Sequence, residues 1–134
     1  NCAEASIKDF GVVCVESGYD ILVGGNGGIE LRGTDKLCHV ATEDEVLEYC
    51  GAYMQLYREE ARYLERTAPW VARVGIAYVK SRLIDDPEGR LALFRRFVHA
   101  QQFMQDDPWA ERAAGKDAHE FAPVADLTIR EAAE

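Results

Sequence analysis

The spacing of the hydrophobic residues changes at Thr42, and this change constrains the fold more than any other feature of the sequence. Before Thr42 the apolar residues stand in short, β-branched runs, which are typical of strands. After it they recur every three or four residues, which is typical of amphipathic helices. The spacing therefore predicts an α+β fold, with a small antiparallel β unit at the N-terminus followed by a mainly helical C-terminal region.

Two apolar runs, residues 12–16 and 19–23, flank a turn-forming Ser17-Gly18 pair, and this pattern predicts a β-hairpin. A run of glycines follows, and then Ile29 to Arg32 alternate in the way of a half-buried strand. We therefore expect a small sheet between Gly11 and about Arg32.

A long amphipathic helix is expected over residues 46–64. Thr42 and Glu45 fit a capping box, in which each side chain satisfies an amide of the first helical turn. One apolar stripe then runs along the helix, with acids and arginines on the other faces. The stripe consists of Val46, Cys50, Tyr53, Tyr57, Ala61 and Leu64.

Prolines mark the starts of three more helices, at Pro69, at Asp86-Pro87 and at Asp107-Pro108. A first helical turn tolerates the missing N–H of proline, and a preceding Asp caps that turn. Four helices are thus expected in all. The buried face of the helix after Pro87 is predicted to comprise Leu91, Phe94, Phe97 or Val98, and Met104.

Charge and composition argue against two classes of partner. The formal charge of -9 would repel phosphate backbones, and the arginines are interleaved with acids instead of forming a basic stripe. No apolar run approaches the ~20 residues that span a bilayer. Without a signal sequence or a dense set of cysteines, a reducing cytoplasm is the expected location, and the start at Asn1 suggests a piece of a longer protein.

The four cysteines, Cys2, Cys14, Cys38 and Cys50, are too widely spaced for the C-x-x-C pairs of a structural zinc site. Cys14 lies in an apolar strand and Cys50 on an apolar helical face, so both are expected in the core. His39, His99 and His119 are far apart in the sequence, and no Ser/His/Asp constellation can be inferred.

The glycine cluster at residues 24–28 has two interpretations. Its N–H groups could form a concave nest for an anion. Alternatively, Asn26-Gly27 could be a tight turn that joins two strands. The spacing does not fit a dinucleotide fingerprint.

Four segments resemble one family in the same order. NCAEASIKDFG resembles the part of sirohaem-dependent nitrite and sulfite reductases that carries the last cysteine of a C-x5-C and C-x3-C motif. VCVESGYDILVGGNGGIELRGTD, REEARYLERTAPWVARVG and DPWAERAAGKDAHEFAP continue the likeness to NAD(P)H-dependent nitrite reductase large subunits, at the C-terminal part of their sirohaem and 4Fe-4S domain.

The resemblance implies that Cys2 is the bridging thiolate, which ligates the 4Fe-4S cluster and is the axial ligand of the sirohaem iron. The other three cluster cysteines would lie outside this chain. Asn26 would pack beside the cofactor, because Gly-Gly-Asn recurs near this position in sirohaem proteins. Cys14, Cys38 and Cys50 would serve packing.

As a whole, the resemblance implies a nitrite reductase that passes electrons from NAD(P)H through FAD, the cluster and sirohaem to nitrite, yielding ammonium. FAD and NAD(P)H would bind to upstream domains of the same subunit, and a small subunit would be a further partner. Residues 1–66 would complete the sirohaem domain and residues 67–134 would form a helical extension, with no cofactor and no activity in the isolated piece. The alternative is a non-catalytic assembly module from Thr42 onwards, suggested by Leu56 and Tyr63 beside the main stripe.

Overall fold

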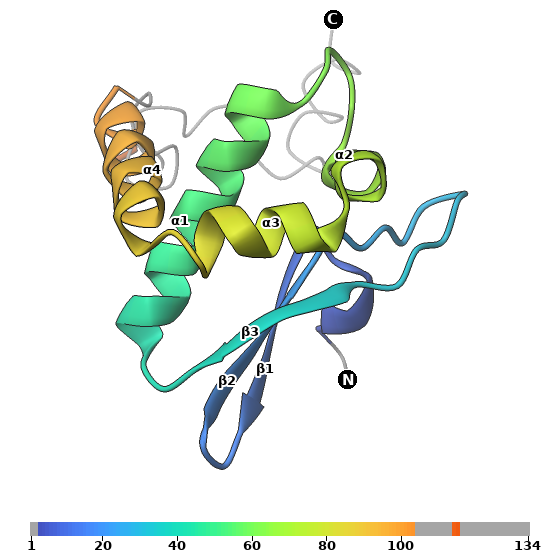
Figure 1. Cartoon of the computed structure of the whole chain (residues 1–134), viewed down its shortest axis with the longest axis horizontal. Coiled ribbons are helices and arrows are strands. Elements are labelled where there is room, and N and C mark those ends of the chain that lie inside the picture. The colour runs from blue at the N-terminus through green and yellow to red at the C-terminus, as the bar shows by residue number, and fades with distance from the viewer. Residues whose placement is uncertain (1–2, 104–113, 116–134) are drawn as a thin grey trace, which may run out of the picture. The chain divides into compact units, whose positions relative to one another are not determined.

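The structure is a computed structural model that describes residues 3–103 and 114–115. Near the N-terminus, after the short 3-10 helix η1 (Ala5–Ile7), the chain forms a three-stranded antiparallel sheet (Figure 1). Its strands are β1 (Phe10–Val15), β2 (Gly18–Val23) and β3 (Asp35–Val40), in the order β1-β2-β3. The predicted hairpin is confirmed, although Val15 pairs with Gly18 and the turn is therefore one residue earlier than expected.

The strand expected over residues 29–32 is wrong. Ile29 and Leu31 are largely exposed, and the segment is a loop closed by a single bridge between Asn26 and Arg32. The third strand is β3 instead, in which Leu37 and Val40 are buried. These residues are three apart, so a regular strand would put them on opposite faces. The pairing with β2 shifts register between Ile21 and Leu22 and passes over Leu37, which allows both to face the core.

Helix α1 (Glu43–Glu60) begins with the predicted capping box: the Glu45 amide donates to the Thr42 hydroxyl at 3.3 Å, and the Glu45 carboxylate accepts from the Thr42 amide at 3.0 Å. The helix ends before the predicted Leu64. Glu65 explains this end, because its carboxylate accepts from the Arg62 amide at 2.9 Å and its carbonyl accepts from the Tyr57 hydroxyl at 2.6 Å. These bonds hold residues 61–65 in a turn.

The helix expected from Pro69 is two helices, α2 (Thr67–Val74) and α3 (Ile76–Leu83), divided at Gly75. Gly75 has φ +84°, a conformation that other residues rarely adopt, and this permits the change of direction.

Helix α4 (Pro87–Gln101) begins as predicted, with the Asp86 carboxylate accepting from the Gly89 amide at 2.9 Å. Its predicted face is partly wrong, because Leu93 is buried in place of the exposed Leu91. Phe94 and Phe97 are half-buried, as predicted. The contact with α1 sets this face. A Cβ on Gly51 of α1 would lie 2.7 Å from the Phe94 ring, so α4 turns Phe94 toward the gap left by that glycine. Met104 and the helix expected at Asp107-Pro108 lie outside the described residues.

The core lies between the sheet and the helices. Tyr53 and Trp70 are fully buried at its centre, with ring centroids 5.8 Å apart. Apolar residues from the sheet and from all four helices complete it: Ile21, Val23, Leu37 and Val40 from the sheet, Ala52 and Leu56 from α1, Val71 from α2, Val79 and Leu83 from α3, and Leu93 from α4. The predicted α+β fold is thus confirmed. No helix among the described residues is long and apolar enough to cross a membrane.

Burial predicts opposite outcomes for two leucines of α1. Leu56 is 1% exposed and Leu47 is 62% exposed. Leu56→Ala should lower the free energy of unfolding by about 2–5 kcal/mol, because a cavity replaces packed methyl groups. Leu47→Ala should change it by less than about 1 kcal/mol. Urea denaturation of the 134-residue chain, followed by circular dichroism, checks both, and equal effects would contradict this core.

Candidate functional site

The segment that follows Cys2 is attached to the sheet by backbone hydrogen bonds. Cys2 itself lies outside the described residues. Three backbone carbonyls within or just after the short 3-10 helix η1 (Ala5–Ile7) accept hydrogen bonds. The Ser6 carbonyl accepts from the Thr34 amide at 2.9 Å. The carbonyls of Lys8 and Asp9 accept from the amides of Gly25 and Gly24, respectively, each at 3.0 Å. The path of the chain from Ser6 to Asp9 is therefore fixed against the end of β2.

The glycines at this crossing are needed for close approach. A Cβ on Gly25 would lie 2.6 Å from the carbonyl carbon of Ile7 and 2.7 Å from the oxygen of Lys8, so no larger residue fits without moving the backbone. Gly24 has φ +71°, in the left-handed region. The predicted turn at Asn26-Gly27 is wrong, because the next strand along the chain is β3, and the loop 26–32 intervenes.

Four of the amides that the nest hypothesis requires already donate to other groups of the protein. The Gly24 and Gly25 amides donate to the N-terminal segment. The Asn26 amide donates to the Arg32 carbonyl at 2.9 Å, and the Gly28 amide donates to the Asn26 side chain at 3.3 Å. These four groups are therefore directed at protein acceptors and not at an anion.

Asn26 fixes the loop through its side chain. The carboxamide nitrogen donates to the Glu30 carbonyl at 2.8 Å, while its oxygen accepts from Gly28. On the other side of the bridge, the Arg32 guanidinium contacts Asp35 at 2.6 Å and also bonds the Gly24 carbonyl. The structure thus assigns Asn26 a positioning contact within the loop.

A pocket of about 360 Å³ lies beside this crossing and brings Asn26 next to the segment that follows Cys2. Its two cations already have carboxylate partners, since Lys8 lies 3.3 Å from Glu4 and Arg66 lies 2.9 Å from Asp9. Both pairs are well exposed, so each is worth at most about 1 kcal/mol and can rearrange around a polar ligand. The pocket is lined by Glu4, Ile7, Lys8, Asp9, Asn26, Gly27, Gly28 and Arg66.

Asp9 joins the pocket to α2. Besides its pair with Arg66, its carboxylate accepts from the hydroxyl of the buried Thr67, at the N-terminal end of that helix. An anion there is stabilised by the unpaired amides of the first turn. This contact holds the N-terminal segment and α2 together although they are far apart in the sequence.

The described cysteines do not gather at the pocket. Cys38 and Cys50 are half-buried, and burial raises the pKa of the Cys38 thiol to about 11 and also raises that of Cys50. Cys14 is exposed, so the prediction that it lies in the core is wrong, because the far half of β1 extends beyond the helices. In residues 3–103 and 114–115, no three side chains of His, Cys, Asp or Glu come together in a way that could hold a metal ion.

The structure contains one group of polar side chains that the sequence analysis did not predict. His39 of β3 lies 2.9 Å from the Asp20 carboxylate of β2 and 3.4 Å from the Ser17 hydroxyl of the hairpin turn. Lys36 also binds Asp20 at 2.7 Å, and the hydrogen bonds from Lys36 and then from His39 lower the pKa of this carboxyl group. The group is exposed and its carboxylate is shared with a lysine, so we interpret it as a surface ion network. The pairing of β2 with β3 brings these side chains together, and the spacing of residues in the sequence does not predict that pairing.

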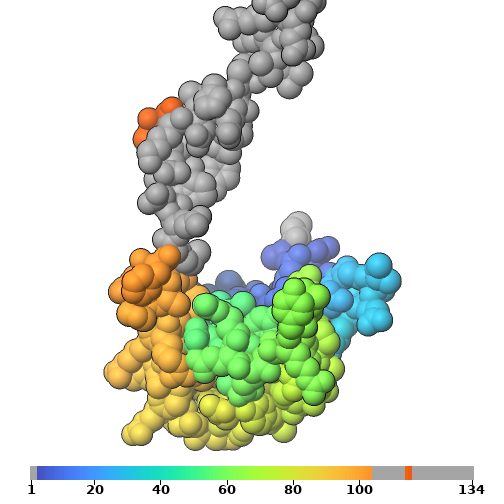
Figure 2. Space-filling model, turned by 90° about the horizontal axis from the view of Figure 1, so that it is seen from above, coloured from blue at the N-terminus to red at the C-terminus, as the bar shows by residue number. Residues whose placement is uncertain are grey.

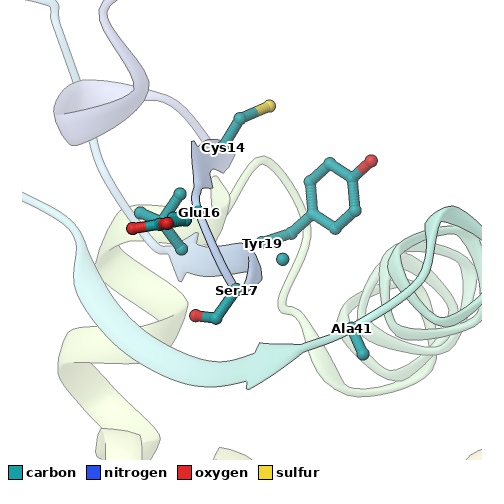
Figure 3. A pocket seen from close by; sticks show the side chains of 7 residues that line it. Cys14, Glu16, Ser17, Tyr19 and Ala41 are labelled. Carbon is teal, nitrogen blue, oxygen red and sulfur yellow. The ribbon is translucent and has the colours of Figure 1, made fainter.

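A second pocket, of about 340 Å³, lies at the same hairpin end (Figure 3). Cys14 and Tyr19 are register partners and project from the same side of the hairpin. The hydrogen bond with Glu43, at 3.2 Å, raises the pKa of the Tyr19 hydroxyl. His99 of α4 belongs to neither pocket, and His119 lies outside the described residues.

Comparison with known proteins gives one family. The model of the nitrite and sulphite reductase 4Fe-4S domain matches residues 1–90. Nitrite reductase [NAD(P)H] of Bacillus subtilis is 50% identical over 111 residues, which cover 83% of this chain and 14% of that protein. The nitrite reductase (NADH) large subunit of Escherichia coli is 38% identical over 90 residues, covering 66% of this chain and 11% of that protein.

A further relative is less similar to this chain. The assimilatory-type sulfite reductase of Nitratidesulfovibrio vulgaris is 28% identical over 83 residues, covering 62% of this chain and 38% of that protein. The chain thus spans a small part of the length of each of these relatives. No solved structure matches significantly.

The thiols should differ in reactivity. At pH 8, iodoacetamide should alkylate Cys14 at least about tenfold faster than Cys38, because Cys38 is half-buried and its thiolate forms only as the pH approaches about 11. Peptide mapping by mass spectrometry measures each rate. In urea the alkylation rates of Cys14 and Cys38 should converge. Equal rates in the folded chain would contradict the placement of β1.

Loss of the Asn26 side chain should loosen the loop. Asn26→Ala removes both carboxamide contacts, so the Gly28 amide should exchange with deuterium faster, and stability should fall by about 1 kcal/mol. Asn26→Asp keeps the acceptor for Gly28 and should protect this amide better than alanine does. Hydrogen exchange measured by NMR separates the two variants, and identical exchange would show that the side chain does not fix the loop.

Proposed function

The chain belongs to the nitrite and sulphite reductase 4Fe-4S domain family, and from this premise we propose that it is part of an oxidoreductase that reduces nitrite to ammonium. In this proposal electrons pass from NAD(P)H through FAD, a 4Fe-4S cluster and sirohaem. The likeness to one relative named nitrite reductase [NAD(P)H] carries the proposal, because that protein is 50% identical over 83% of this chain.

The chain's part in this reaction is to supply one thiolate and to aim it. We propose that Cys2 ligates the cluster and bridges to the sirohaem iron, since a thiolate is a soft, anionic donor that can bind iron on two sides. When bound, the cluster and sirohaem supply the single electrons that reduce nitrite. The backbone bonds of Ser6, Lys8 and Asp9 support this role by fixing the chain that follows the ligand.

The pocket beside Asn26 suits a polar, anionic group. Lys8 and Arg66 offer two exposed cations that can turn toward carboxylates such as those of sirohaem, while Asn26 keeps the loop in place. Because Cys2 is one of four required thiolates, the remaining three belong to the parent protein outside this chain. Among the described residues, Cys14, Cys38 and Cys50 do not come together in a group that could hold a metal ion.

The rest of the parent protein carries the other steps in this proposal. FAD and NAD(P)H bind to upstream domains, a small subunit is a further partner, and the 134-residue chain alone binds no cofactor and is inactive. A cytoplasmic location suits the cluster thiolates, which a reducing environment preserves.

The division into a domain part over residues 1–66 and a helical extension over 67–134 stays a prediction. The alternative, an assembly module from Thr42 onwards, loses Leu56 as support because Leu56 is in the core.

Cys2→Ser in the parent subunit should abolish nitrite reduction and change the visible spectrum of the coupled cofactors, because a hydroxyl does not replace a bridging thiolate. Electron transfer from NAD(P)H to an artificial acceptor should continue, since that half-reaction uses other domains. Cys14→Ser is the matched control, being the same chemical change at an exposed thiol, and should leave activity and spectrum unchanged. Normal nitrite turnover in the Cys2 variant would refute the assignment.

A further inference from the structure

An apolar groove of about 470 Å³ lies between the loop 26–32 and α2. Leu31 and Leu64 stand on its two sides and are 73% and 84% exposed, while Ala68, Pro69 and Ala72 of α2 also line it. Figure 2 shows the light-blue loop standing out beside the light-green segment that follows α1. Large apolar side chains that share one groove are unfavourable in water, and such surfaces commonly mark a contact with another part of a protein.

Both walls of the groove are held by polar contacts. The loop is closed by the paired backbone bonds of Asn26 and Arg32, each 2.9 Å, and by the bond from the Asn26 side chain to Glu30. On the other wall, Glu65 binds the Arg73 guanidinium at 2.8 and 2.7 Å. Leu31 and Leu64 are therefore presented to solvent from a fixed frame and not from a chain that could fold them inward.

Leu64 has an unfavourable backbone conformation. Its φ of +62° lies in the left-handed region, which a residue with a Cβ rarely adopts because the Cβ then crowds the backbone. The exposed leucine thus has two unfavourable features, strain and hydration, and because it is 84% exposed the described residues cover little of it. A partner that covers Leu64 would recover the hydration cost.

We infer that this groove is the docking surface for another part of the parent polypeptide, one that presents an apolar surface flanked by carboxylates. The inference rests on the proposed function, in which this chain is a small part of a longer subunit; it covers only 14% and 11% of the length of two relatives. The occupant is thus on the same polypeptide, where its effective concentration is high.

Charge and position favour this occupant over a second copy of the chain. Of the charged residues that line the groove, Arg32 and Arg66 are cations and Glu30 is an anion, so the groove itself favours carboxylates on its partner. The net charge of the whole chain is -9, so two copies would repel each other overall. Asn26 and Arg66 line both this groove and the pocket beside the segment that follows Cys2. A segment seated in the groove therefore reaches the edge of the proposed cofactor pocket and closes one side of it.

Hydrogen exchange in the parent subunit and in the 134-residue chain tests the inference. The amides of residues 29–31 and 64–68 should exchange at least about tenfold more slowly in the parent, whereas the amide of Leu47, exposed on α1, should exchange equally in both. Equal exchange at the groove in the two proteins would overturn the inference. Slow exchange at the groove of the isolated chain, together with dimer mass at high concentration, would also overturn it and would favour a second copy.

Two substitutions sharpen the test. Leu64→Asn suits the left-handed conformation, so it should maintain or raise the Tm of the isolated chain, yet it should speed groove exchange in the parent. Leu31→Asp should act likewise on the parent, and Leu47→Asp is the control outside the groove. If the control loosens the groove as much as the two variants do, the inference fails.

The visible spectrum of the same parent samples keeps the two proposals apart. A parent that carries cluster and sirohaem but leaves the groove open would refute the docking surface alone. A parent that protects the groove but binds neither cofactor would refute the proposed function alone.

Discussion

The burial of Trp70 between Tyr53 and Tyr57 is the contact on which the rest of the structure depends. Its indole ring lies 5.8 Å from each of the two tyrosine rings, and Tyr53 in turn lies 6.0 Å from Phe10 of β1. This line of aromatic rings joins α2, α1 and the sheet. Each such side chain buries a large apolar area, worth more than any single polar contact on the surface, so the helices cannot separate from the sheet without exposing it.

The polar contacts around this core have a different effect, because they decide where chain segments point. Asp9 binds Thr67 and Arg66 at the start of α2, and the backbone of residues 6–9 pairs with Thr34 and the glycines after β2. Exposed ion pairs contribute little to stability, but several contacts on one segment restrict its direction. The segment that follows Cys2 is restricted in this way, as the role proposed for Cys2 requires.

The same loop serves the proposed site and the proposed docking surface. Asn26 and Arg32 close the loop, Arg66 lines the pocket on one side of it and the groove on the other, and Leu31 projects from it. A protein segment seated on Leu31 and Leu64 would therefore also restrict the cofactor pocket. In the proposed arrangement the docking of that segment and the closure of the pocket are one event.

The sequence by itself determined the α+β order, the hairpin, and the helix starts at Thr42 and Asp86, because turn pairs and caps act between residues a few positions apart. The family resemblance was also readable, as it lies in the order of local segments. Only the tertiary structure decided that β3 and not residues 29–32 is the third strand, that α4 buries Leu93, and that Cys14 is exposed. It alone brought His39 to Asp20 and Arg66 to Asp9, since those contacts join residues distant in the chain. The burial of a side chain depends on which neighbouring element covers it. The hydrophobic spacing within one segment does not identify that neighbour.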